Sequence, residues 1–456
     1  MVQTVIRNVL LFDGRTAREG ATVIFNSESG LIESVSTTSV SPSSYPAGAT
    51  VIDGRGHTLL PGLIDAHIHS YGLHLPPGSD IAGVLKGPLK CGVTTVCCMH
   101  SDSENVWDHQ KRLKTELDAA RKAGETGTVT MSSLKSAHLG ATIDGGWPVP
   151  IVMANHPTEE VSTTPPKDDT SSDFPQLKVA ISKWPKLTAE TAADFVADHK
   201  KRGADYIKLM QENCCSLAFP TNSIPVATLE LQTAVVDAAH KHGLKVLGHA
   251  TAIENTEIIL KSGADGLAHT FIDQAPTKAI ISLYREKNAF VVPTLVVLTS
   301  LTGEEQTLRE KFADIASSKG LIDSTQKENM LASLKAPAEG ASIEHAYESI
   351  RQLKAAGIDI AAGTDSVAGL QGTAIGPSLW QELWMYVEKC GFSVQEALHS
   401  ATEVSARRLG FDDRGTVEVG KRADLLLVKG NVLDGLENLW EGDGVINVWK
   451  AGIRAA

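Results

Sequence analysis

The chain has 456 residues, of which 42% are hydrophobic and 21% charged, a composition typical of a globular, enzyme-sized protein and not of a disordered or fibrous one. The length excludes a single small domain, whereas one barrel of about 250 residues with a smaller partner domain would fit. Lys and Arg total 42 against 54 Asp and Glu, so the net charge is −12. A surface of this sign repels phosphate backbones and anionic lipids, and we expect neither nucleic acid nor a membrane as a partner.

The sequence carries no sign of export or membrane insertion. The longest apolar stretch, residues 290–301, is interrupted by polar residues and falls short of the roughly 18 residues that a bilayer requires. The amino-terminal residues show no basic region followed by an apolar block. The six cysteines form no Cys-x-x-Cys pattern, and no Asn-x-Ser/Thr sequon is present. We therefore expect a reduced, cytoplasmic protein.

Short β segments dominate both ends of the chain. Residues 1–58 hold four such segments, each closed by Gly, Asp or Asn, and the residues after 412 hold three more. This pattern predicts a small β-sandwich domain composed of residues 1–58 and 413–456. The alternative is that each end only decorates the central region.

Residues 59–412 show a different pattern, in which apolar runs alternate with amphipathic segments as in repeated βα units. Most of these runs follow a helix-like segment that ends in Gly, the usual residue after a helix C-terminus. Eight runs predict an α/β fold of the (β/α)₈ TIM-barrel type. The predicted strands are residues 63–69, 93–99, 127–134, 205–210, 244–249, 265–269, 290–295 and 358–364.

Two segments exceed what a minimal barrel needs. Residues 135–187 are polar and rich in Pro, Ser and Thr, and residues 296–345 carry charged, helix-like sequence. Insertions of this length on the loops after barrel strands normally build or cover an active site. We expect both insertions to lie at the catalytic end of the barrel.

The His67-Ile68-His69 run stands at the end of the first predicted barrel strand. Alternate residues of a strand project to one face, so the two imidazoles can hold one metal ion together. By itself the pattern fits two ordinary histidines at a strand terminus equally well. Four further polar residues stand at or just beyond other predicted strand ends, and in a barrel these ends meet at one mouth. They are Lys208, His249, His269 and Asp365.

This set of residues resembles the metal-dependent amidohydrolase superfamily. The opening TVIDGRGHTLLPGLIDAHIHS and the closing GTVEVGKRADLLLVKGN are both typical of that superfamily, including its β-sandwich built from the two termini. The runs GADYIKLM, AHKHGLKVLGHAT and GADGLAHTF are similar to the branch that holds imidazolonepropionase-like proteins, Xaa-Pro dipeptidases and ochratoxinase-type carboxamide hydrolases. The resemblance covers nearly the whole chain.

The resemblance implies two divalent metal ions, with His67 and His69 as ligands of one ion and His249 and His269 as ligands of the other. It makes Asp365 both a ligand and a proton acceptor. Imidazole and carboxylate ligands without thiolates suit zinc, and manganese, cobalt or nickel would also fit. The expected mechanism is attack on the substrate carbonyl by a metal-bridging hydroxide, with Asp365 as general base and then general acid.

Lys208 takes the bridging position between the two metals in this resemblance. An ammonium group has three donors and no acceptor, so an unmodified lysine cannot bridge two cations. Addition of CO₂ would convert the amine into an anionic carbamate that can, and we therefore expect a carbamate on Lys208. The alternative is a lysine paired with a neighbouring acid such as Glu212.

Two histidines are expected to contact the substrate. His138 follows the third predicted strand, where the dipeptidase-like branch places a substrate-facing histidine, and His100 ends the second strand. A structural role is the alternative for both. Tyr71 and His74 follow the first strand, and there a solvated loop is the expectation.

The chain also departs from the pattern of this branch. Residues 210–215 read MQENCC, where many members have a glycine-rich loop, so the known substrates of the branch do not transfer to this chain. Cys214 and Cys215 match no ligand position of the family. Deaminases of the superfamily usually place Glu three residues after the fifth-strand histidine, and Ala252 occupies that position here.

These observations predict a binuclear zinc hydrolase of amide or peptide-like C–N bonds, an ochratoxinase-like carboxamidase or a dipeptidase. The expected substrate is a small carboxylated molecule with an apolar group. A hydrolase of cyclic amides or lactones is the alternative on the same site, and a non-catalytic scaffold on the same fold is the alternative from another class. We expect the protein to form a homo-oligomer.

Overall fold

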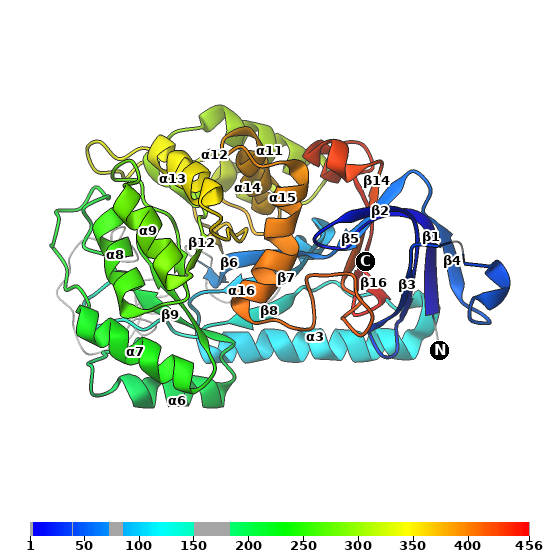
Figure 1. Cartoon of the computed structure of the whole chain (residues 1–456), viewed down its shortest axis with the longest axis horizontal. Helices are drawn as coiled ribbons and strands as arrows, with labels where there is room; N and C mark the ends of the chain where they lie inside the picture. The colour runs from blue at the N-terminus through cyan, green and yellow to red at the C-terminus, as the bar shows by residue number, and fades with distance from the viewer. Residues whose placement is uncertain (1–2, 39, 73–84, 150–182, 456) are drawn as a thin grey trace, which may run out of the picture.

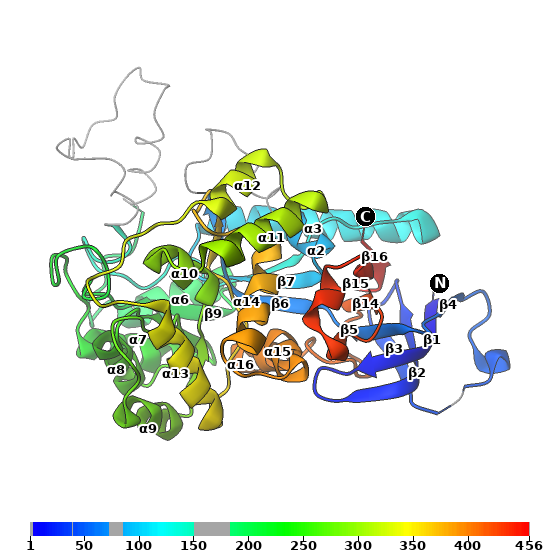
Figure 2. The same cartoon turned by 90° about the horizontal axis from the view of Figure 1, so that it is seen from above.

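The computed structural model describes residues 3–38, 40–72, 85–149 and 183–455 (Figures 1 and 2). The expectations for His74, for the side chain of Tyr71 and for most of the 135–187 insertion fall outside the described part. Within it the fold is α/β and contains one mixed sheet and two parallel sheets. None of the described helices combines the length and the hydropathy that a membrane span needs.

The mixed sheet joins the two ends of the chain. Its order is β16-β15-β14-β5-β1-β2-β3, with β4 paired to β1. β14 runs antiparallel to β5, so that Leu425 faces Pro61 and Lys429 faces His57. The rings of Phe25 and Trp449 meet in its core, with 5.4 Å between their centroids. The strands are β1 (Gln3–Phe12), β2 (Ala17–Asn26), β3 (Ile32–Ser36), β4 (Thr50–Asp53), β5 (His57–Pro61), β14 (Leu425–Lys429), β15 (Val445–Lys450) and β16 (Ile453–Arg454).

Two four-stranded parallel sheets form the centre of the molecule, in the orders β13-β6-β7-β8 and β12-β11-β10-β9. Every residue of β7 and β9 is buried, as expected for parallel strands covered on both faces. The strands are β6 (Leu63–Gly72), β7 (Val93–Cys98), β8 (Ser133–Ser136), β9 (Tyr206–Met210), β10 (Lys245–His249), β11 (Gly266–Ala268), β12 (Phe290–Val292) and β13 (Ser366–Ala368).

Hydrogen bonds connect the two parallel sheets on both sides. Asp205 N donates to Ser136 O over 2.9 Å, between the β8 end of one sheet and the β9 end of the other. On the other side, Ala361 N donates to Val291 O over 2.9 Å and Ala66 N donates to Ala362 O over 2.8 Å. Residues 359–362 therefore lie between β12 and β6. Closure into a complete barrel stays a prediction at this point.

Three of the predicted strands differ from the observed ones. The third begins later than expected, at Ser133, because Val129 N donates to Arg454 O and ties the preceding residues to the C-terminal strand. The seventh ends at Val292, because Thr294 has a left-handed φ of 55° and a helix begins at the next residue. Residues 358–364 form only an isolated bridge at Ile360, and β13 starts after the expected end.

Helices pack around the parallel sheets (Figures 1 and 2). Figure 1 shows the long helix α3 running from β8 toward the mixed sheet, and both β8 and β16 contact it. The longer helices are α3 (Ser103–Ala123), α6 (Ala192–Arg202), α7 (Leu229–Lys241), α8 (Ile253–Ser262), α9 (Lys278–Lys287), α10 (Leu295–Thr302), α11 (Gln306–Ser318), α12 (Ser324–Leu331), α13 (Ile343–Ala355) and α14 (Pro377–Glu388). The shorter helices are α2 (Gly87–Lys90), α15 (Val394–His399) and α16 (Ser405–Leu409). Helices α10, α11 and α12 fall in the 296–345 insertion and its edge.

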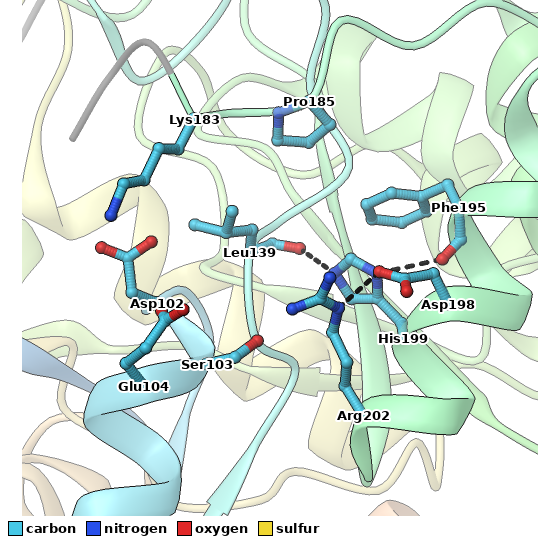
Figure 3. A pocket seen from close by; sticks show the side chains of 10 residues that line it. All are labelled: Asp102, Ser103, Glu104, Leu139, Lys183, Pro185, Phe195, Asp198, His199 and Arg202. Atoms are coloured by element: carbon cyan, nitrogen blue, oxygen red, sulfur yellow. Dashed lines mark hydrogen bonds and ion pairs between the residues drawn. The ribbon is translucent and has the colours of Figure 1, made fainter. Parts of the chain in front are cut away.

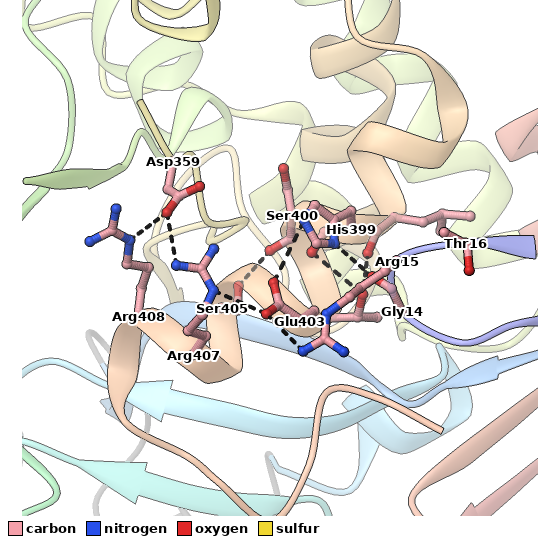
Figure 4. Close-up of polar contacts among 12 residues, drawn as sticks. Gly14, Arg15, Thr16, Asp359, His399, Ser400, Glu403, Ser405, Arg407 and Arg408 are labelled. Atoms are coloured by element: carbon pink, nitrogen blue, oxygen red, sulfur yellow. Dashed lines mark hydrogen bonds and ion pairs between the residues drawn. The ribbon is translucent and has the colours of Figure 1, made fainter. Parts of the chain in front are cut away.

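A polar cluster fixes the loop after β1 to the helical segment before α16 (Figure 4). Glu403 lies in a π-helical turn, Ser400–Val404, and its side chain is 8% exposed. Its Oε1 lies 3.3 Å from a guanidinium nitrogen of Arg15 and 3.0 Å from Nε of Arg407. His399 Nδ1 donates to Gly14 O over 2.6 Å. The amino-terminal hairpin is therefore held by a carboxylate between two arginines.

A buried ion pair joins the two C-terminal strands of the mixed sheet. Lys450, at the end of β15, contacts Asp424, just before β14, and their side chains are 0% and 4% exposed. Ala451 N donates to the other carboxylate oxygen over 2.7 Å. Burial opposes ionisation of Asp424, but the ammonium of Lys450 holds the pKa of this carboxyl well below its ordinary value. The pair therefore stabilises the fold above the ordinary carboxyl pKa of about 4, and the effect is lost in more acidic solution.

We expect Asp424→Asn to lower the free energy of unfolding by about 3 kcal/mol, because it leaves the buried amine of Lys450, whose pKa burial lowers to about 7, without its charged partner. Urea denaturation at pH 7 measures the change. The control is Asp443→Asn, which removes the carboxylate of an exposed pair with Lys429 in the same sheet and should change stability little. Equal small effects of the two substitutions would contradict this account of the pair.

Candidate active site

Two imidazoles and a carboxylate meet at the carboxyl end of β6. Nε2 of His67 lies 3.1 Å, and Nε2 of His69 2.9 Å, from the same oxygen, Oδ1 of Asp365. The two histidines project to one face of β6 because they alternate along the strand. Asp365 N donates to His67 O over 2.7 Å, which places the carboxylate beside the rings. Among the described residues these three groups could hold one metal ion.

The other three predicted ligands lie beside this group. The ring centroids of His269 and His67 are 4.9 Å apart, and those of His269 and His249 are 4.6 Å apart. Lys208 stands on β9, opposite the middle of β10, and lines the same cavity as His249, His269 and Asp365. The structure thus brings all six residues into one group, with Lys208 in the middle of its strand. Their roles as ligands stay a prediction.

Burial decides the charge of most of these groups. It lowers the pKa of His67 to about 3 and the pKa of His269 well below its ordinary value. It also lowers the pKa of Lys208 to about 7. Burial opposes ionisation of Asp365 as well, but His67 and His69 hold the pKa of its carboxyl well below the ordinary range. For His69 burial lowers the pKa, but the contacts with Asp365 and Cys98 together outweigh it, and the pKa rises to about 9.

Hydrogen bonds at one ring nitrogen fix the orientation of His69 and of His249. His69 donates from Nδ1 to His100 O over 3.2 Å, which leaves Nε2 toward Asp365. Nε2 of His249 lies 3.3 Å from Glu212, and a neutral imidazole that donates there keeps its lone pair on Nδ1. Glu212 therefore pairs with His249 and also accepts from Thr251. This arrangement does not show the alternative pairing of Lys208 with Glu212.

The donor set fits divalent metal ions. Nδ1 of His67 and Nζ of Lys208 are buried and have no hydrogen-bond partner among the described residues. An unpartnered buried polar group is costly, so a ligand or a modification that satisfies these atoms would stabilise the site. Neutral imidazoles with a carboxylate suit zinc better than calcium or magnesium.

A cavity of about 110 Å³ opens beside the six residues. One side is polar and is formed by the histidines, Lys208 and Asp365. The other side is apolar and includes three residues of α10. Trp147 stacks against His249, with 5.0 Å between ring centroids and 24° between planes. The site therefore presents a reactive face and an apolar face to the same small space.

Glu382 on α14 holds helix α10 in place. Its two oxygens accept from Leu295 N over 2.9 Å and from Val296 N over 2.8 Å, the first two N–H groups of α10. A carboxyl at this position satisfies donors that have no partner within the helix. Helix α10 belongs to the 296–345 insertion that was expected near the catalytic end, whereas Glu382 was not predicted, because it lies far from α10 in the sequence.

The structure treats the two predicted substrate histidines differently. His100 lines the cavity, accepts from Gly140 N at Nδ1 over 2.8 Å and packs edge-on against Trp184. His138 is not among the residues that line it. Its Nδ1 lies 2.9 Å from Ser103 Oγ, beside a second cavity of about 300 Å³.

Figure 3 shows this second cavity. His199 fills one wall and lies within 2.9 Å of Leu139 O and 3.0 Å of Phe195 O. The positive φ of His138, 55°, is what turns the chain at this point. His138 is therefore not among the described residues that line the cavity beside Asp365, and its role in substrate binding stays a prediction.

Residues 210–215, which depart from the pattern of the branch, line the cavity only in part. Met210 lines it, whereas Cys214 and Cys215 do not. Lys208 is the one lysine or arginine among the described lining residues. The expected carboxylate of the substrate therefore finds no dedicated cation in this part of the site.

Known proteins share this sequence pattern and this fold. Residues 58–454 match the model described as the Amidohydrolase family. An imidazolonepropionase of Deinococcus deserti is 23% identical over 434 residues, which cover 90% of this chain and 87% of the relative. A crystal structure of a Xaa-Pro dipeptidase with bound methionine superposes with a TM-score of 0.68 at 23% identity and 99% coverage of both chains. The ochratoxinase of A. niger gives 0.66 at 19% identity and covers 99% of this chain and 95% of its own.

The Glu382 carboxyl that caps α10 should make the stability of the protein depend on pH. Burial raises the pKa of Glu382 to about 8, against the effect of the two helix N–H groups. The folded protein therefore holds a proton that the unfolded chain releases near pH 4.5, and this contribution to stability is lost as the pH rises toward 8. The amide introduced by Glu382→Gln cannot ionise, so we expect the free energy of unfolding of this variant, relative to that of the wild type, to rise across this window by at most about 1.4 kcal/mol per pH unit. Urea denaturation between pH 5 and pH 8.5 measures the difference.

The matched control is Glu388→Gln, because Glu388 is exposed on the same helix. Its stability should follow the wild-type curve. Parallel curves for the wild type and Glu382→Gln would show that the carboxyl does not titrate in this window.

Proposed function

Because this chain belongs to the Amidohydrolase family and is a hydrolase of C–N bonds, we propose that it hydrolyses amide bonds of small molecules with two divalent metal ions, most simply zinc, held beside Asp365. The family match confirms the resemblance inferred from the sequence. The observation that carries the proposal is the meeting of four imidazoles, one lysine and one carboxylate beside a single cavity. A scaffold without activity has no need to keep six such groups buried together.

In this proposal His67, His69 and Asp365 hold one metal ion, and His249 and His269 hold the other. Divalent ions bound there would supply Lewis-acid chemistry, acidifying water and polarising a carbonyl group. Lys208 lies within the same group of residues with its amine buried and unpartnered. A neutral amine can add CO₂ with loss of one proton, and we assign the resulting carbamate to Lys208 as the bridge.

Asp365 is the proposed acid–base group. Its carboxylate is ionised and lines the polar side of the cavity, where it can accept a proton from an attacking water. The same proton then passes to the leaving nitrogen as the C–N bond breaks. The balance of the reaction is one amide and one water consumed, and one carboxylic acid and one amine formed.

The fold assigned to this function is a closed (β/α)₈ barrel over residues 59–412. The hydrogen bonds at both junctions of the two parallel sheets support this closure. The residues before and after the barrel, 1–58 and 413–456, are assigned to one β-sandwich domain, supported by the pairing of β14 with β5. The active site then lies where barrel enzymes keep it, at the carboxyl ends of the strands.

Asp365→Asn should reduce turnover by at least about a hundredfold, the usual scale for a lost acid–base group. Hydrolysis is measured on a panel of N-acyl amino acids, Xaa-Pro dipeptides, anilides and lactones with zinc-loaded protein. Asp359→Asn is the control, because Asp359 lies on the same segment but pairs with Arg407 and Arg408 away from the cavity. Wild-type rates in Asp365→Asn would remove this carboxylate from the chemistry.

Lys208→Ala should lower the metal content of the purified protein, because it removes the proposed bridge. Elemental analysis after growth with zinc gives the metal content per chain, and Lys245→Ala, an exposed lysine on the next strand, is the control. A high-resolution map that shows an unmodified lysine in a fully metallated protein would refute the carbamate.

A further inference from the structure

The apolar side of the cavity is extensive for so small a space. Its members are aliphatic side chains from α10 and from three loops, and Trp147 closes the side next to His249. Leu298 is 1% exposed and Val297 7% exposed, so the wall is part of the packed interior and not a mobile fringe. The aliphatic residues include Leu217, Val297, Leu298, Leu301, Leu334 and Leu370.

Few charged side chains line the described part of the cavity, and the proposed reaction uses each of them. Among the described lining residues Lys208 and Asp365 are the one lysine or arginine and the one carboxylate. The proposed function uses both of them. His100 supplies no cation either, because its Nδ1 accepts the Gly140 N–H, and an imidazolium has no acceptor nitrogen.

A substrate carboxylate against this wall would have no charged partner among the residues that the structure describes. Burying an unpaired carboxylate is far more costly than burying an apolar group of the same shape, whose burial is instead favourable. An apolar cavity of about 150 Å³ holds a benzene molecule, so a space of about 110 Å³ suits an apolar group no larger than one phenyl ring.

We propose that the substrate is a neutral amide that carries an uncharged apolar group, a phenyl ring or a branched alkyl chain, and that this group packs on the wall formed by α10 and Leu370. The inference rests on the proposed amide hydrolysis and narrows its substrate class. It is an alternative to the carboxylated substrate expected from the sequence.

A pair of matched anilides tests the substrate class. In 4-methylacetanilide and 4-acetamidobenzoate a methyl and a carboxylate occupy the same ring position. We expect kcat/KM of the zinc-loaded enzyme to be at least about tenfold higher for the methyl compound. Calorimetric titration with the product amines, 4-methylaniline and 4-aminobenzoate, measures binding without any reaction and should show the same preference.

Substitution of the wall supplies the second test. Leu370 is only partly buried, so Leu370→Arg can be accommodated and places a cation beside the apolar group. This variant should favour 4-aminobenzoate over 4-methylaniline, whereas the control Leu370→Met should keep the wild-type order. Leu334→Arg, at another partly buried position of the wall, is the second variant if the first does not fold.

The outcomes separate the inference from the function on which it rests. Hydrolysis of the carboxylated anilide as fast as the methyl compound, with equal binding of the two amines, overturns the neutral substrate and leaves amide hydrolysis standing. Preferential binding of 4-methylaniline without hydrolysis of any amide supports the apolar subsite and overturns the proposed reaction. A preference for 4-aminobenzoate in the wild type overturns the inference directly.

Discussion

The candidate site depends on one contact between distant parts of the chain. A single oxygen of Asp365 lies within 3.1 Å of His67 and 2.9 Å of His69. The neighbouring Thr364 fixes this contact by donating from Oγ1 over 2.8 Å to Asp65, which is 299 positions away and two residues before His67. Burial removes water from all of these groups, so each depends on the others for a polar partner. A shift in this pairing would separate the carboxylate from both rings.

In the rest of the site, the surrounding side chains determine which buried imidazole nitrogens have a hydrogen-bond partner. Glu212 orients His249 from one side, and Thr294 lies 2.8 Å from Nδ1 of His269 on the other. Contacts of this kind fix which ring nitrogen is left for a ligand. Glu382 acts at a greater distance, because its carboxyl caps α10 and so sets the position of the apolar wall. A polar and an apolar face are thereby held within one small cavity.

Much of this could be predicted from local sequence. His67 and His69 share a face because strands alternate, and glycines after helices mark where the next strand begins. The same reasoning misplaced the start of the third strand, because Val129 is held by the last strand of the chain. It also did not show that His138 lies beside Ser103, and the substrate role of His138 stays a prediction. Such contacts have no signature within the segment itself.

The sequence by itself determined the alternation of strands and helices, the family and the six polar residues at or near strand ends. Hydrophobic periodicity and the glycines that follow helices are features of neighbouring residues, so they can be read without the structure. Only the tertiary structure decided the size of the cavity, its apolar wall and how few charged side chains stand among its described lining residues. These features arise where α10, Leu370 and Trp147 meet. Which side chains meet across a core is set by packing between segments far apart in the chain, and close packing leaves a defined space only after all of them are in place.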